Sequence, residues 1–116
     1  MKAESIARQL GLRPVTERAS LDREVSGGYA GDLLSDVLAN SRNGDLWITL
    51  QTHLNIVAVA SMKELAGIVI VNGRRPEEET VGKAEEEGIP ILISSLFTFE
   101  LVGRLYQKGI LGMSPC

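Results

Sequence analysis

The sequence has few of the residues from which metal sites and disulfides are built. Its 116 residues include one cysteine, Cys116, and one histidine, His53. A single chain with this inventory cannot assemble a Cys/His zinc site or a disulfide framework. We therefore predict no metal site and no bound cofactor. A lone cysteine also fits the reducing environment of the cytoplasm, where we expect the protein to reside.

Aromatic and basic side chains are also scarce. Aromatic residues make up 4% of the chain, and 12 basic residues are outnumbered by 15 acidic ones, giving a formal net charge of −3. A nucleic-acid surface needs clustered Lys and Arg together with aromatic stacking platforms, so we exclude nucleic acid as a partner. No apolar run approaches the length of a membrane span, and the stretch from Met1 to Leu12 lacks the apolar region of a secretory signal. We therefore expect no membrane partner.

Apolar residues make up 44% of the chain, which is enough to form one globular domain without disulfides or a structural metal. We expect a single domain over residues 1–116. Within it we distinguish an amino-terminal helix and extended segment at 1–20, a core at 21–107 and a tail at 108–116. The tail is expected to be frayed or bound to a partner.

Three short apolar runs, at 45–50, 67–71 and 89–93, predict strands. After Gly67 the second run is continuously β-branched, as is typical of a strand buried on both faces. Each run is followed by a helical pattern. The first helix is expected from Asn55 to Leu65, with Asn55 as its cap. The second is expected to start at Pro76 and stop at Gly88, and the third to run from a cap at Ser94 or Ser95 to near Gly109.

The first half of the chain has weaker patterns. A helix is expected from about Lys2 to Leu10, ending at Gly11, followed by extended pieces around 14–16 and 23–26. Gly27, Gly28 and Gly31 are expected to break the chain before Asp32 caps or opens a helix that ends at the Asn43-Gly44 turn. The resulting order, αββα and then three βα units, predicts an α/β fold. We expect a single three-layer domain with a mainly parallel, mixed sheet and helices on both faces.

Polar residues follow the three predicted parallel strands, where such sheets collect ligands. The candidate ligand-binding residues are Thr49, Gln51, Thr52, His53, Asn55, Asn72, Gly73 and Ser94. Arg74 and Arg75 stand beside them. If the strands are neighbours, these loops form one rim that suits an anion or a nucleotide.

Each of these residues also has a structural explanation. Thr52, Asn55, Ser94 and Ser95 are the residue types that cap helices, and a histidine such as His53 is often only hydrogen-bonded. Asn72-Gly73 suits a tight turn, and Arg74 and Arg75 can pair with the glutamates at 77–79. The glutamates at 85–87 are expected to be a solvated helix end.

Motifs of catalysis are missing from the sequence. No G-x-S-x-G elbow surrounds a serine, the cluster Gly27-Gly28-x-x-Gly31 lacks the spacing and the lysine of a phosphate loop, and no dinucleotide fingerprint follows a strand. Asp32 and Asp36 lie one helical turn apart and could hold a divalent ion, but a solvated helix face is the expected outcome. We predict no catalytic residues and no enzyme activity.

Four segments taken together resemble a known family. They are the residues 32–37 (DLLSDV), residues 47–60 (WITLQTHLNIVAVA), the strand that ends in Asn72-Gly73, and residues 83–92 (KAEEEGIPIL). In this order they are similar to a DRTGG domain in its stand-alone form, over about Leu21 to Gln107. The resemblance implies a fold like that of the amino-terminal domain of HPr kinase.

DRTGG domains are regulatory segments beside CBS domains in some pyrophosphatases, and stand-alone forms accompany hydrogenase and redox-sensing kinase genes. The resemblance therefore implies an accessory module that self-associates and has no catalytic residues. This chain has residues 51–55 where longer members carry Gly-Asp-Arg, and Asn72-Gly73-Arg74 where they carry Thr-Gly-Gly.

The resulting hypothesis is a non-catalytic regulatory module that forms a homodimer. It binds a small anionic ligand, with an adenine nucleotide as one candidate, or it docks onto a partner enzyme. The alternative is a protein-interaction subunit of a hydrogenase or other redox complex, held by the last helix, Phe97, Phe99 and the tail.

Overall fold

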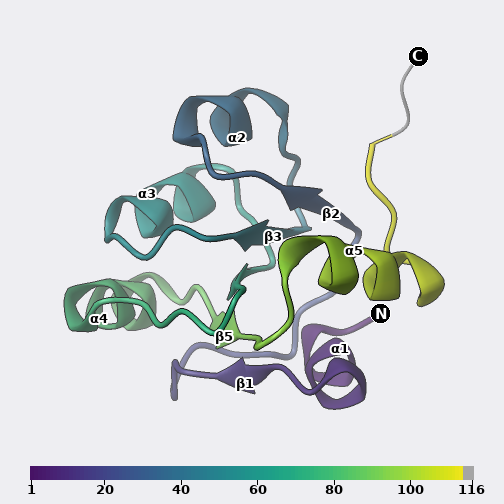
Figure 1. Cartoon of the computed structure of the whole chain (residues 1–116). Helices are drawn as coiled ribbons and strands as arrows, with labels where there is room; N and C mark the ends of the chain where they lie inside the picture. The colour runs from purple at the N-terminus through teal and green to yellow at the C-terminus, as the bar shows by residue number, and fades with distance from the viewer. Residues whose placement is uncertain (114–116) are drawn as a thin grey trace.

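The computed structural model describes residues 1–113 as five strands and five helices (Figure 1). The strands are β1 (Arg13–Pro14), β2 (Gly27–Ala30), β3 (Asp45–Thr49), β4 (Gly67–Ile70) and β5 (Ile91–Ile93). The helices are α1 (Ala3–Leu10), α2 (Leu34–Asn40), α3 (Asn55–Met62), α4 (Glu78–Glu87) and α5 (Thr98–Gln107). The predicted order of elements is confirmed, but the second strand lies at Gly27–Ala30 and not at the predicted 23–26.

The strands form one sheet in the order β1-β5-β4-β3-β2. β2, β3, β4 and β5 are parallel, and β1 joins the edge of β5 in the antiparallel direction. Helices α2, α3 and α4 cover one face of the sheet, and α1 and α5 cover the other (Figure 1). The molecule is thus the three-layer α/β domain that the sequence predicts.

The core lies on both faces of β3 and β4, in which every residue is buried. Side chains alternate between the two faces along each strand. Leu46 and Ile48 pack in the cluster beneath α1 and α5, whereas Trp47 packs in the cluster beneath α2, α3 and α4. The indole Nε1 of Trp47 donates a hydrogen bond to the carbonyl of Gly31 (2.8 Å), so its burial leaves no unpaired donor.

Two helix ends follow the expected chemistry. α1 ends at Gly11 and α4 ends at Gly88, and both glycines adopt the left-handed conformation, with φ of 67° and 70°. α4 begins after Pro76, and its first turn carries Glu78 and Glu79 as the sequence predicts. None of the helices within residues 1–113 is long and apolar enough to cross a membrane.

The glycine-rich stretch at 27–31 is a strand, β2, where the sequence predicted only a break. A Cβ on Gly27 would lie 3.0 Å from the carbonyl oxygen of Leu111 and 2.9 Å from Oδ1 of Asp45. The neighbouring Gly28 donates its N–H to that same Leu111 carbonyl (3.1 Å). Glycine is needed at position 27 because the chain after α5 crosses close to this edge strand.

The caps predicted for α3 and α5 are wrong. Asn55 is the first residue of α3, Leu54 precedes it, and no side chain caps the helix. The first N–H groups of α3 instead bond to the carbonyls of His53 and Leu54 in a tight turn (3.1 Å each). Ser94 follows the last residue of β5, Ile93, and α5 begins only at Thr98, so neither Ser94 nor Ser95 caps it.

The tail predicted at 108–116 is described only as far as Met113. Ile110 is buried beneath α5, whereas Leu111 and Met113 are exposed. The last residues of the predicted tail, including Cys116, lie outside the described residues.

Candidate functional site

The carboxyl ends of β3, β4 and β5 are neighbours, so the loops that follow them adjoin. In the ladder, Thr49 of β3 is level with Ile70 of β4, and Ile70 is level with Ile93 of β5. The rim expected from the sequence therefore exists as a spatial feature. Its residues nevertheless have different local roles.

Asp32 fixes the first part of the rim. Its Oδ1 accepts hydrogen bonds from the hydroxyl of Thr49 (2.9 Å) and the N–H of Leu50 (2.7 Å), and its carbonyl accepts one from the side-chain amide of Gln51 (2.8 Å). Asp32 does not cap α2, which begins after Leu33 without a side-chain cap. Thr49 is buried, so its hydroxyl is committed to this loop.

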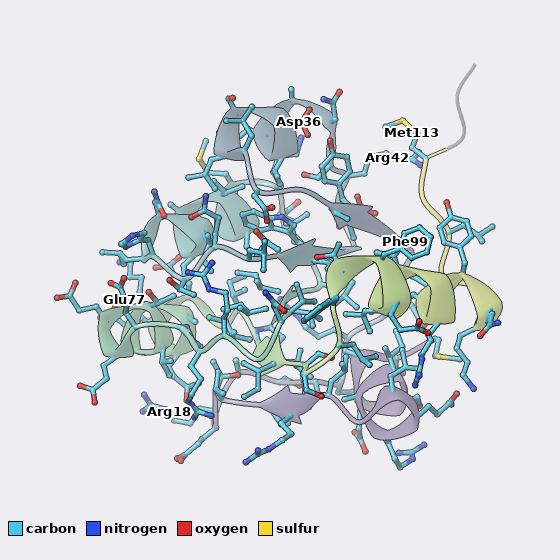
Figure 2. The ribbon with its side chains drawn as sticks, in the orientation of Figure 1. Arg18, Asp36, Arg42, Glu77, Phe99 and Met113 are labelled. Carbon is cyan, nitrogen blue, oxygen red and sulfur yellow. The ribbon has the colours of Figure 1, made fainter. Side chains whose placement is uncertain are left out.

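The second part of the rim is tied to the start of α4. The carbonyl of Thr52 accepts a hydrogen bond from the hydroxyl of Thr80 (2.8 Å), and Nδ1 of His53 lies 2.9 Å from Oε2 of Glu77. Figure 2 labels Glu77 at this end of α4. His53 and Asn55 are exposed. Glu77 thus pairs with the histidine and not with Arg74 or Arg75.

The turn after β4 is built by Asn72 and Gly73, both with φ of 68°. The N–H of Arg74 bonds to the carbonyl of Val71 (3.2 Å), which closes the turn. Consecutive residues of positive φ favour the Asn-Gly pair, so the tight turn predicted from the sequence is confirmed.

This turn is also bonded to the loop after β5. The N–H of Asn72 donates to the carbonyl of Leu96 (2.8 Å), and the N–H of Gly73 donates to the carbonyl of Ser94 (2.9 Å). The hydroxyl of Ser94, a buried residue, accepts the N–H of Leu96 (3.1 Å). The two loops therefore form one rigid unit.

The chain changes faces between β4 and β5. From β4 it leads to α4 on one face of the sheet, and from the adjacent β5 it leads to α5 on the other (Figure 1). Such a topological switch point opens a crevice outside the carboxyl ends of the strands, which is where α/β proteins bind ligands. In this sheet the switch point lies at one end of the predicted rim.

A groove of about 280 Å³ occupies the switch point. It is lined by Gly11, Arg13, Gly73, Arg75, Ile93, Ser94 and Ser95. Arg13 arrives there because antiparallel β1 places it level with Ile93 at the end of β5. Arg13 and Arg75 are both exposed, and within residues 1–113 neither guanidinium group forms an ion pair with a carboxylate.

The groove and the predicted residues overlap only in part. Gly73 and Ser94 line it, and Asn72 shares its turn, whereas the candidates from Thr49 to Asn55 lie along the rest of the rim. Sequence reasoning placed Arg75 and Ser95 at the rim without counting them as candidates, and it missed Arg13. No local signal marks Arg13, because its position depends on pairing with a strand far along the chain.

The carboxylates of the described chain do not form a metal site. Within residues 1–113, no group of three His, Cys, Asp or Glu side chains is placed to hold an ion. Asp36, labelled in Figure 2, accepts hydrogen bonds from the Tyr29 hydroxyl and from the Asn40 amide. The hydrogen bond to Asp36 raises the pKa of Tyr29 above its usual range.

Comparison with known proteins defines the fold class. The chain matches no protein-family model, and no curated protein matches its sequence. Its structure is similar to that of the CBS and DRTGG domains of the regulatory region of Clostridium perfringens pyrophosphatase, solved with the activator diadenosine tetraphosphate. The TM-score is 0.68 at 13% sequence identity. The match covers 95% of this chain and 47% of that one, so this chain spans about half of its neighbour. This likeness concerns the fold, and it is consistent with the DRTGG-like fold expected from the sequence.

Proposed function

We propose that this chain is a non-catalytic regulatory module of the DRTGG type that binds a small anionic ligand in the cytoplasm. The observation that carries this proposal is the groove at the switch point between β4 and β5. Its polar lining consists of arginine and serine side chains without a carboxylate. The two guanidinium groups are donors only, and with no carboxylate beside them the charge of the lining favours anions over cations.

The ligand we propose is phosphorylated, with an adenine nucleotide as the first candidate. The pyrophosphatase regulatory region that shares this fold was solved with an adenine dinucleotide, its activator. The rim offers additional polar groups beyond the groove, among them Gln51, Thr52, His53 and Asn55, for the remainder of such a ligand.

Calorimetric titration of the purified chain tests this function. The titrants are ATP, ADP, AMP and diadenosine tetraphosphate, with adenosine as the uncharged control. We expect dissociation constants below about 1 mM for phosphorylated compounds and none measurable for adenosine. Absence of binding by every nucleotide, or equal binding of adenosine, contradicts the nucleotide proposal.

We also propose that the module is a homodimer that uses α5. Phe99 projects from this helix (Figure 2) and is 93% exposed, and Tyr106 is 53% exposed. Gly103 lies between them on the same side of the helix, and a Cβ there would meet nothing within 4 Å. A stripe of two aromatic residues around a glycine can pack against its own copy across a two-fold axis.

A second candidate function uses the same surface differently. Phe97, which directly precedes α5, is 69% exposed. Exposed aromatic side chains at this end of α5 also suit a partner enzyme, such as a hydrogenase or another redox complex, for which the chain would be an interaction subunit. A chain that is monomeric alone and copurifies with such an enzyme from its native lysate supports this candidate over the homodimer.

A further inference from the structure

The switch-point groove holds two cationic side chains that have no counter-ion in the described structure. Arg13 comes from β1 and Arg75 from the loop before α4, so two distant parts of the chain supply them. Within residues 1–113, four of the twelve basic side chains form ion pairs with carboxylates, namely Lys2, Arg8, Lys83 and Arg104, whereas Arg13 and Arg75 do not. Two exposed guanidinium groups that line one hollow give it a positive potential, which favours an anion between them.

We propose that this groove binds the phosphate group of a phosphorylated small molecule, with Arg13 and Arg75 as its charge partners. This inference rests on the proposed function and names the chemistry of its ligand. A guanidinium group presents a planar pair of donors that matches two oxygens of one phosphate. Arginine from two sides can thus engage different oxygens of the same group.

The serines at the end of β5 supply neutral donors. Ser95 is exposed in the groove, and the hydroxyl oxygen of Ser94 accepts the N–H of Leu96, which leaves the hydroxyl hydrogen of Ser94 to donate. Phosphate oxygens accept from hydroxyl and guanidinium groups alike. The polar side chains that line the groove therefore all have a hydrogen to give to the same anion.

The floor of the groove is already in its binding geometry. The hydrogen bonds from Gly73 to Ser94 and from Asn72 to Leu96 hold its two loops together without a ligand. Gly11 and Gly73 present no side chain, and a Cβ at either would meet nothing within 4 Å, so both leave the entrance open. A preformed site loses less free energy to ordering when it binds.

The size of the groove sets which part of a ligand it takes. A volume of about 280 Å³ lies just below the range of about 300–1,000 Å³ for small-molecule sites. The groove fits a phosphate or pyrophosphate group and leaves a larger organic portion to the adjoining surface. One such surface is the hollow formed by Val15, Arg75, Pro76, Glu78 and Val81, which shares Arg75 with the groove.

The test is a titration of the full chain with sodium pyrophosphate and with AMP, followed by amide shifts in NMR spectra. The variants are Arg13→Gln, Arg75→Gln and the double substitution. The matched control is Arg74→Gln, because Arg74 is exposed and adjacent in sequence but does not line the groove. Citrate at the same ionic strength separates phosphate from carboxylate chemistry.

We expect pyrophosphate to shift the amides of Gly11, Gly73 and Ser95. Each single substitution should weaken binding about tenfold or more, since a charge-assisted hydrogen bond is lost. The double substitution should abolish binding, and Arg74→Gln should change it by less than about twofold. Because the substituted residues are exposed, all four variants should keep the far-ultraviolet circular dichroism spectrum of the wild type.

The other outcomes separate the two proposals. If the Arg13→Gln and Arg75→Gln variants bind nucleotides as tightly as the wild type does, the groove is not the phosphate site, and the proposed function still stands. If the wild type binds pyrophosphate but no nucleotide, and the arginine substitutions weaken that binding, the groove is the phosphate site and the nucleotide candidate is wrong. Citrate that binds as tightly as pyrophosphate overturns the phosphate assignment, and no binding of any anion at about 10 mM overturns the inference as a whole.

Discussion

Single carboxylates hold several loops of this protein. The clearest is Glu85 of α4, whose two oxygens accept the backbone N–H groups of Glu17 (2.6 Å), Arg18 (3.0 Å) and Ala19 (2.9 Å). The sequence predicted a solvated helix end at 85–87, which is wrong for Glu85. Partial burial acts to raise the pKa of Glu85, but the three backbone N–H groups outweigh it and hold the pKa below its usual range.

Neutralising Glu85 should therefore weaken the clamp between α4 and the segment after β1. We expect Glu85→Gln to lower the free energy of unfolding by about 1 kcal/mol, because partly exposed charge-assisted bonds become weaker amide contacts. Urea unfolding followed by circular dichroism measures this. Glu86→Gln is the control, since Glu86 is exposed and forms only a surface pair with Lys83, 3.6 Å away.

The same carboxylate predicts a pH dependence. Because its pKa is lower in the folded state, its contribution is present above the usual glutamate pKa and is lost as the pH falls through the folded value. The difference in unfolding free energy between wild type and Glu85→Gln should therefore shrink as the pH falls below about 4.5. A difference that stays constant through this range contradicts the clamp.

At the scale of elements, α4 carries two glycines with opposite roles. Gly88 ends the helix at φ of 70°, a conformation that costs other residues about 1 kcal/mol. Gly82 lies inside the helix, and a Cβ there would meet nothing within 4 Å. The same substitution is thus expected to have opposite effects at the two positions.

Gly88→Ala should lower the melting temperature, and Gly82→Ala should raise it, the latter through about 0.5–1 kcal/mol of improved helix propensity. Differential scanning calorimetry of both variants gives the comparison directly. If Gly82→Ala also destabilises the protein, Gly82 must pack against a partner such as a second copy of the chain, because a single chain leaves room for a Cβ there.

The elements that could be predicted from the sequence are those whose burial is local. β3 and β4 are buried throughout, so their continuous apolar runs identified them within a residue or two. β1 and β2 were not predictable in the same way. The two-residue strand β1 depends on pairing with β5, and β2 begins with Gly27 because the chain after α5 passes close to it. Neither fact is visible in the local sequence.

The site was predictable in position but not in detail. Parallel βα order places the loops after β3, β4 and β5 at one edge, and this expectation needed only the sequence. The switch point depends on α5 packing on the face opposite α4, which a helical pattern alone does not reveal. Arg13 stayed unrecognised because its position depends on the pairing of β1 with β5, whereas Gly73 and Ser94 follow strands that the sequence predicts.

At the scale of the whole molecule, the α5 surface predicts self-association. We expect the wild-type chain to be a dimer by light scattering coupled to size exclusion. Phe99→Ser should raise the dissociation constant at least about tenfold, because a central aromatic residue is removed. Met62→Ser is the matched control, since Met62 is 72% exposed on α3, which covers the opposite face of the sheet. A monomeric wild type, or an unchanged dimer in Phe99→Ser, contradicts this surface.

The central claim is that the switch point between β4 and β5 binds a phosphorylated anion. The most direct measurement is a crystal structure of the full chain grown with AMP, with the phosphate located in an anomalous or difference map. The account predicts phosphate density between Arg13 and Arg75, with Ser95 in hydrogen-bond contact. Density for the phosphate elsewhere, for example against His53 and Thr52 with the groove empty, would contradict it.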